Sequence, residues 1–184
     1  MTAHRILLFR GMNIGGIRAG VGEQRAMATD LGLGNPRTLL ASGNLVVESE
    51  HDPRDLEAAV EAETERRFGR RIDTVVRTDV EWNALIAANP FPSEAVRDPA
   101  RLLAVVMKAG IKAGGLKGLR ALAVGDERVE AVEVAGGSTL FCWHPNGIGD
   151  SAMAAKAVPR LIGVGTGRNW NTVLKLAAMA GVDV

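Results

Sequence analysis

The chain contains very little cysteine. Cys142 is its only cysteine in 184 residues. A single cysteine cannot form a disulfide within the chain, and this is typical of proteins from a reducing compartment. Because Cys142 lies between Phe141 and Trp143, we expect it to alternate with them across a sheet as a buried, inert thiol.

Long apolar runs are also absent. Residues 1–10 hold too short an apolar run for a signal peptide. No segment approaches the roughly 20 apolar residues that a membrane-spanning helix needs. We therefore expect a cytoplasmic protein without a membrane partner.

Net charge and aromatic content are low as well. The formal net charge is +1, so the chain has no overall field that would draw it onto nucleic acid. Aromatic residues make up 4% and tyrosine is missing, which leaves few rings on which bases could stack. Both features disfavour a nucleic-acid partner, and RNA or single-strand binding is kept only as an alternative function.

The histidines show no metal-ligand spacing. His4, His51 and His144 lie far apart in the sequence, and no second ligand is near any of them. We therefore expect no metal and no cofactor. An enzyme would need a general base, for which only His144 and Asp150 are available near the candidate loops, and we interpret His144 as a surface residue at a strand end.

Glutamates recur at every second position of one segment. Glu61, Glu63 and Glu65 fall within a stretch that the pattern predicts to be helical. We interpret them as a solvated helix face and not as a pair of catalytic carboxylates.

The apolar residues predict secondary structure for the first half of the chain. Hydrophobic residues make up 47%, enough for a core without disulfides or metals. The order of elements is strand, helix, strand, strand, helix, strand, which is the split βαβ or ferredoxin-like unit. The expected elements are a strand at 5–9, a loop from Arg10 to Gly16, a helix at 22–31 with Gly32 as its cap, strands at 38–41 and 45–48 around the hairpin Ser42-Gly43-Asn44, a helix opened by Asp52 and Pro53 with Leu56, Ala59 and Val60 on its buried face, and a strand at 72–76.

The second half repeats this order loosely. Asp79 is expected to cap a helix that Asn89-Pro90 ends, and the proline-rich stretch from Phe91 to Pro99 is interpreted as a linker. We predict an α+β fold made of a tandem pair of ferredoxin-like (split βαβ) lobes with antiparallel sheets. Its expected parts are an N-terminal lobe at 1–78, a helix and linker at 79–100, and a C-terminal lobe at 101–184, in which strands at 102–107, 129–134, 139–143 and 164–166 accompany helices at 114–122, from about 151 and from about 170.

Four segments resemble a known family. Residues 7–16, 42–47, 146–149 and 168–176 are similar to its LLRGINVGG, SGNVVF, DGIG and RNWNTVxKL segments, in the same order. On these motifs the chain resembles the domain-of-unknown-function 1697 family of bacterial proteins over nearly its whole length. The resemblance implies two ferredoxin-like lobes and carries no activity with it. Where the family continues with basic residues on either side of a serine, this chain has Asp150-Ser151-Ala152-Met153, so two positive charges are missing there.

The glycine-rich loop from Arg10 to Gly16 is the first candidate for binding. It lies between a strand and a helix, where backbone N–H groups and the helix dipole favour an anion. Its spacing matches neither the Walker pattern nor the dinucleotide fingerprint. The alternative is ordinary turn structure, and the same alternative holds for the hairpin at Ser42 to Asn44.

The second candidate is the start of the last helix. Asn169 is expected to cap this helix, and Trp170 follows the spacing of core residues. That leaves Arg168, Asn171 and Lys175 as polar groups near one helix start. The alternative is a capped, solvated helix that docks one lobe on the other.

These observations give one leading hypothesis, the binding of a small anionic or phosphate-bearing ligand at the seam between the lobes. Arginine would supply a planar fork for phosphate or carboxylate, and asparagine would orient the ligand. The residues expected to converge are Arg10, Asn13, Gly15, Gly16, Ser42, Asn44, Arg168, Asn171 and Lys175.

Overall fold

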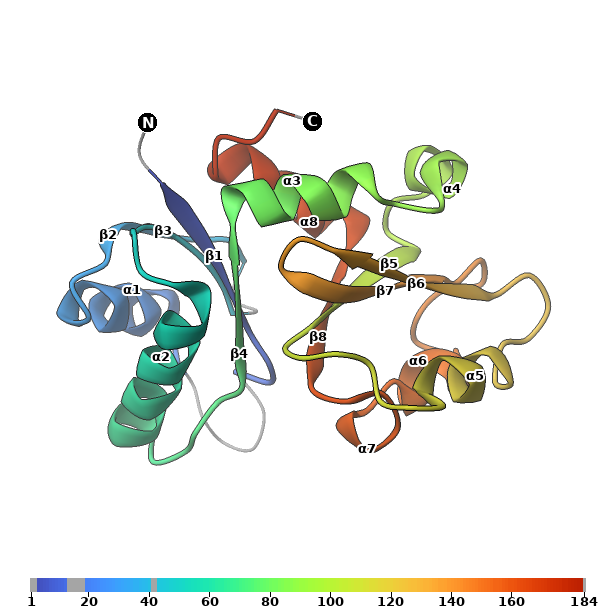
Figure 1. The fold of residues 1–184 in the computed structure, drawn as a ribbon, viewed down its shortest axis with the longest axis horizontal. Helices are drawn as coiled ribbons and strands as arrows, with labels where there is room; N and C mark the ends of the chain where they lie inside the picture. Colours follow the sequence, from blue (N-terminus) through green and yellow to red (C-terminus); the bar gives the residue numbers. More distant parts are fainter. Residues whose placement is uncertain (1–2, 13–18, 41–42, 184) are drawn as a thin grey trace. The chain divides into compact units, whose positions relative to one another are not determined.

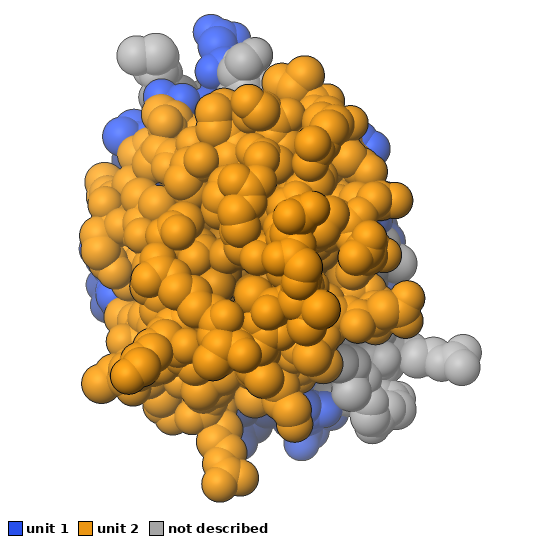
Figure 2. Space-filling model, turned by 90° about the vertical axis from the view of Figure 1, so that its right-hand side faces the viewer, with its two compact units in different colours: residues 1–83, 175–184 blue, residues 84–174 orange. Residues whose placement is uncertain are grey.

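The protein consists of two compact units, shown in two colours in Figure 2. One comprises residues 1–83 and 175–184, and the other comprises residues 84–174. The computed structural model describes residues 3–12, 19–40 and 43–183. Helices α3 (Asp79–Ala87) and α8 (Trp170–Met179) each begin in one unit and end in the other.

The first unit is a four-stranded antiparallel sheet with two helices (Figure 1). The strand order is β2-β3-β1-β4, which is the order of a split βαβ unit. Its elements are β1 (His4–Phe9), α1 (Val21–Asp30), β2 (Gly34–Thr38), β3 (Asn44–Glu48), α2 (Pro53–Phe68) and β4 (Thr74–Thr78).

Helices α1 and α2 lie on one side of this sheet and enclose the core of the unit (Figure 1). Leu7 and Phe9 of β1 point into that core, where they join Met27 of α1 and Leu56 and Val60 of α2. All five side chains are at most 3% exposed. Burial of each contributes roughly 1.5–3 kcal/mol, so these contacts hold the sheet against the two helices.

Helix α2 begins where the sequence predicts. The Asp52 carboxylate accepts the backbone N–H of Arg54 at 2.8 Å, and Pro53 occupies the first helical position. Gly69 ends the helix in the left-handed conformation, with φ of +69°. One residue of the expected buried face is wrong, because Ala59 is exposed.

Strand β2 lies four residues earlier than predicted. The expected strand at 38–41 is wrong, because the N–H of Leu39 already bonds to the carbonyl of Asn44 at 3.0 Å and Leu40 takes a φ of +59°. These two residues begin the turn, so strand pairing stops at Thr38. Pro36 fits within β2 because this is an edge strand with a register shift between Gly34 and Arg37.

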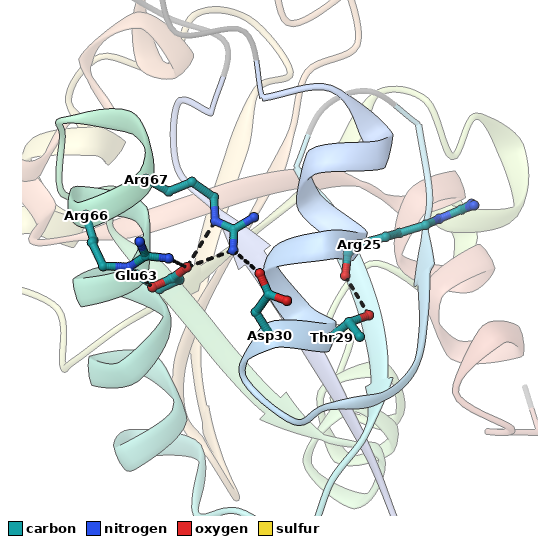
Figure 3. Close-up of polar contacts among 6 residues, drawn as sticks. All are labelled: Arg25, Thr29, Asp30, Glu63, Arg66 and Arg67. Carbon is teal, nitrogen blue, oxygen red and sulfur yellow. Dashed lines mark hydrogen bonds and ion pairs between the residues drawn. The ribbon is translucent and has the colours of Figure 1, made fainter.

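The glutamates of α2 are not a solvated face, contrary to the prediction. Glu61 is 3% exposed and its carboxylate accepts the backbone N–H of Thr74 at 2.9 Å. Glu63 is mostly covered and forms ion pairs with Arg66 and with Arg67, which also reaches Asp30 of α1 (Figure 3). Of the three predicted positions, only Glu65 is exposed. Carboxylates on the sheet-facing side of α2 are needed as hydrogen-bond acceptors, because backbone N–H groups of β4 would otherwise be buried without a partner.

The second unit repeats the sheet of the first. Its strand order β6-β7-β5-β8 matches β2-β3-β1-β4 position by position, so the predicted α+β fold with two antiparallel sheets is confirmed. A helix, α4, occupies part of the stretch interpreted as a linker. The elements are α4 (Pro92–Arg97), β5 (Leu102–Met107), α5 (Gly115–Arg120), β6 (Arg128–Val134), β7 (Gly137–Trp143), α6 (Ala152–Lys156), α7 (Pro159–Ile162) and β8 (Gly165–Asn169).

The core of the second unit contains the single cysteine. Cys142 is 2% exposed and packs with Val105, Leu119 and Leu140, while its neighbours in β7 face the other side of the sheet. Burial raises the pKa of the Cys142 thiol to about 12, so it stays protonated at neutral pH. Among the described residues, no helix is both long and apolar enough to cross a membrane.

Candidate functional site

Arg10 stands at the end of the central strand β1. Its backbone N–H bonds to the carbonyl of Asp73 at 2.8 Å, which ties it to the residue just before β4. Its side chain is 38% exposed, and the distance from its Nη1 atom to the Asp73 carboxylate is 3.9 Å. That distance exceeds hydrogen-bonding range, so the guanidinium remains accessible at the rim of the sheet.

The turn before β3 lies directly against this strand end. The carbonyl of Gly43 accepts the N–H of Phe9 at 2.9 Å. A Cβ added at Gly43 would lie 2.9 Å from the Cβ of Phe9 and 3.1 Å from that of Met12. Gly43 also has a φ of +75°, so both space and backbone conformation require glycine here. The structure thus brings parts of the first two predicted segments together.

The Asn44 side chain stabilises the turn between β2 and β3. Its side chain is fully buried, and its amide donates to the carbonyl of Leu39 at 3.0 Å. This contact closes the loop between β2 and β3. Four other predicted site residues, Asn13, Gly15, Gly16 and Ser42, lie outside the described residues.

Arg168 belongs to the second unit, on strand β8. Its Nη1 atom donates to Thr166 Oγ1 and to the carbonyl of Gly167, each at 2.7 Å. Burial lowers the pKa of the guanidinium to about 10, which leaves it charged at neutral pH. Arg168 is therefore tied into its own strand to a greater degree than Arg10.

The start of α8 is capped as predicted. The Asn169 side-chain oxygen accepts the N–H of Thr172 at 3.0 Å and its hydroxyl at 2.9 Å. Trp170 is 5% exposed and its ring centroid lies 6.1 Å from that of Phe141, so it is a core residue. Asn171 is exposed in the second unit.

Lys175 is also exposed, one turn further along α8, and belongs to the first unit. The described contacts therefore place Arg10, Asn44 and Lys175 in one unit and Arg168 and Asn171 in the other. Their convergence into one site stays a prediction.

His144 is not a surface residue, contrary to the prediction. Its ring is fully buried, with Nδ1 3.1 Å from the Glu127 carboxylate. Burial pushes the pKa of Glu127 upward, but hydrogen bonds from Ser151, the Val124 N–H and His144 outweigh it and leave that pKa below its usual value. His144 directly follows the apolar strand β7, and the sequence offered no sign that a glutamate 17 residues earlier would fold against it.

The second candidate base, Asp150, is exposed beside a cavity of about 250 Å³. Its walls include Glu127, Asn146 and Ser151, and the Ser151 hydroxyl caps α6 by accepting the N–H of Ala154 at 3.0 Å. The charged side chains of this wall are acidic, which does not suit an anion. Within 3–12, 19–40 and 43–183, no cluster of three or more histidine, cysteine, aspartate or glutamate side chains could hold a metal ion.

Comparisons with known proteins agree with the fold. No curated protein matches the chain. Among solved structures, the chain resembles the conserved bacterial protein SP0830 from Streptococcus pneumoniae, with a TM-score of 0.74 and 22% sequence identity over 98% of this chain and 99% of that chain. A likeness at this identity shows the fold alone. The model of a family described as "Protein of unknown function (DUF1697)" matches residues 1–135. Because this match covers most of the sequence, the chain belongs to the DUF1697 family.

Proposed function

We propose that the protein binds a small oxyanion, a phosphate or carboxylate group, at the end of β1 around Arg10. The observation that carries this proposal is the approach of Gly43 to Phe9 and Met12, which brings a glycine turn against the strand end that presents an accessible guanidinium. Two left-handed glycines, Gly11 and Gly43, keep the backbone free of side chains at this point.

The electrostatics of Arg10 support the proposal. Asp73 is its partner at 3.9 Å, and both side chains are about 40% exposed, at 38% and 43%. An exposed pair of this kind contributes roughly 0–1 kcal/mol. An incoming oxyanion can therefore compete for the guanidinium, whose donor geometry matches phosphate and carboxylate.

The proposal is centred on the first unit. Asn44 holds the turn from inside, and Arg168 is tied to its own strand, so neither is needed as a direct ligand contact. Asn171 and Lys175 remain candidates for ligand contact. The assignment of both units as ferredoxin-like lobes is part of the same proposal, supported by the shared strand order.

The experiment is an isothermal titration of the full chain with inorganic phosphate and with citrate, at constant ionic strength. The variants are Arg10→Gln, Arg10→Lys and, as a matched control, Arg66→Gln, which removes an arginine that is 68% exposed on α2. We expect Arg10→Gln to weaken binding roughly ten- to hundredfold, as loss of a charged hydrogen bond does, and Arg66→Gln to bind like the parent. Arg10→Lys should fall between them because it keeps the charge and loses the fork.

Equal affinity in the parent and in Arg10→Gln would overturn the proposal, as would the absence of binding by the parent. A melting temperature that stays close to the parent's shows that Arg10→Gln is folded and that lost binding reflects the site.

The alternative, RNA or single-strand binding, has less support. Phe68 is partly buried, and the other three phenylalanines and all three tryptophans are at most 5% exposed. No ring is therefore open for base stacking. Binding of a single-stranded oligonucleotide that weakens steeply with salt would favour this alternative.

An enzymatic function is the other alternative. His144 cannot meet a substrate from its buried position, which leaves Asp150 as the candidate base. Turnover of a substrate panel by the parent that is abolished in Asp150→Asn would favour an enzyme.

A further inference from the structure

A second cavity, of about 440 Å³, lies within the second unit. It is formed between α4, the loop before β6 and the end of β7. Its volume falls in the range of small-molecule sites. The side chains that matter for its chemistry are Glu94, Arg97, Asp126, Arg128, Trp143 and Pro145.

Two arginines of this cavity are held by aromatic rings. The guanidinium carbon of Arg97 lies 4.9 Å from the ring centroid of Trp143, and that of Arg128 lies 5.0 Å from the centroid of Phe91. Both rings are at most 5% exposed, so they are fixed in the core. A guanidinium stacked on a fixed ring loses less conformational entropy when it binds a ligand.

The charges of the cavity wall separate into a pair and two single groups. Arg128 hydrogen-bonds to Glu94, and this bond holds the pKa of Glu94 below its usual value. Within the described part of the chain, neither Arg97 nor Asp126 forms an ion pair, and both are exposed. One cation and one anion thus remain available in a wall that is otherwise neutral.

We propose that this cavity binds a small zwitterion of the size of an amino acid or dipeptide. Its carboxylate would meet the Arg97 guanidinium, its ammonium group would meet the Asp126 carboxylate, and its apolar part would lie against Pro145. A simple anion would satisfy Arg97 and be repelled by Asp126, and a simple cation would suffer the reverse. Only a ligand with both charges uses the whole wall. This site is independent of the Arg10 proposal.

The test uses the full chain and ligands that differ by one charge. The probes are the dipeptide glycyl-phenylalanine, its N-acetylated form, which lacks the ammonium group, and its C-terminal amide, which lacks the carboxylate. Isothermal titration up to about 10 mM covers affinities weaker than 1 mM. We expect each blocked form to bind at least about tenfold more weakly than the parent dipeptide.

Two variants assign each charge to its partner. Arg97→Gln should bind the dipeptide and its amide equally, because the carboxylate has lost its partner. Asp126→Asn should bind the dipeptide and its N-acetyl form equally. Arg160→Gln is the matched control, since it removes an exposed charge of the same unit that lies on another cavity. It should bind the three probes with the same relative affinities as the unaltered protein.

The proposal is overturned if the parent binds none of the three probes, or binds all three with equal affinity. It is also overturned if both variants bind the dipeptide and its two blocked forms with the same relative affinities as the unaltered protein. Because the blocked ligands probe the unaltered protein, a variant that fails to fold does not remove the test.

Discussion

The carboxylate of Glu57 accepts the backbone N–H of Val76 at 3.0 Å. Val76 lies on β4, which ends the order of its sheet and would otherwise present unpaired N–H groups. Glu61 accepts the N–H of Thr74 and Glu81 that of Thr78, at 2.9 and 2.8 Å. Glutamate carboxylates thus accept hydrogen bonds from every second backbone N–H of β4. These are the N–H groups that an additional strand would need, so another chain cannot readily pair with this edge.

The role of Glu61 can be measured as stability. Glu61→Ala should lower the free energy of unfolding by about 2–3 kcal/mol, because the buried N–H of Thr74 loses its acceptor. Glu65→Ala, on the exposed side of the same helix, should change it by less than about 0.5 kcal/mol. Urea denaturation followed by circular dichroism provides both values. Equal effects of the two substitutions would show that Glu61 does not hold the edge.

Acid should weaken the ion pairs of Glu63 with Arg66 and Arg67 on α2. Hydrogen bonding to Arg66, and then to Arg67, lowers the pKa of Glu63 from 4.5 to about 2. The folded-state pKa lies below the unfolded one, so this stabilisation is present above pH 4.5 and is lost as the pH falls toward 2. Because Arg66 is 68% exposed, solvent screening keeps the effect small.

Melting temperatures of the parent and of Glu63→Gln at about pH 6 and about pH 3 test this expectation. The difference in melting temperature between the parent and Glu63→Gln should be smaller at the lower pH. Glu65→Gln is the control and should show the parent's pH dependence. An equal difference in melting temperature at both pH values would contradict the stabilising role of the Glu63 carboxylate.

Gly43 and Gly32 form a matched pair for substitution. Both take a left-handed φ, +75° and +74°, but a Cβ at Gly32 would meet nothing within 4 Å whereas one at Gly43 would clash with Phe9. Gly32→Ala should therefore cost about 1 kcal/mol from backbone conformation alone. Gly43→Ala should cost at least about 1 kcal/mol more, because close-packed atoms must move. Chemical denaturation of the two variants measures the difference, and similar losses would mean that the turn is not pressed against β1.

Substitutions of Asn169 and Asn171 distinguish capping of α8 from ligand contact by its exposed face. Asn169→Ala removes the acceptor of the Thr172 N–H and should cost about 1 kcal/mol. Asn171→Ala changes an exposed position two residues later and should be nearly neutral in stability. If Asn171→Ala leaves the melting temperature unchanged yet weakens phosphate binding, the ligand contact predicted for Asn171 gains direct support.

The buried thiol should be unreactive in the folded protein. With a pKa of about 12 and 2% exposure, Cys142 should react with a disulfide reagent only when the chain opens. The rate of labelling at about pH 8 should be negligible in native buffer and fast in guanidinium. Rapid labelling of the native protein would show that β7 is accessible.

The sequence predicted those parts of the fold whose signals are local. Asp52 and Pro53 mark the start of α2 because a cap and a ring-locked φ act within one turn. Strand β5 is a continuous apolar run and lies at the predicted residues, 102–107. Strand β2 was misplaced because Leu40 is apolar, whereas the structure exposes 56% of its surface in a turn.

The contacts that could not be predicted are those between distant segments. Nothing local distinguishes Glu61, whose acceptor role depends on β4, from the exposed Glu65. The same holds for His144, which the sequence indicates only as a residue at a strand end. Its contact with Glu127, 17 residues earlier, makes it a buried, paired group. The cavity of Arg97 and Asp126 joins segments about 30 residues apart and left no motif in the sequence.

The matching strand orders of the two sheets extend to single residues. Arg10 follows the central strand of one sheet and Lys108 follows that of the other. The N–H of Arg10 bonds to the carbonyl of Asp73 at 2.8 Å, and that of Lys108 bonds to the carbonyl of Val164 at 2.9 Å, each the residue before the last strand of its sheet. A substitution at Arg10 therefore has a structurally matched counterpart at Lys108 in the other unit.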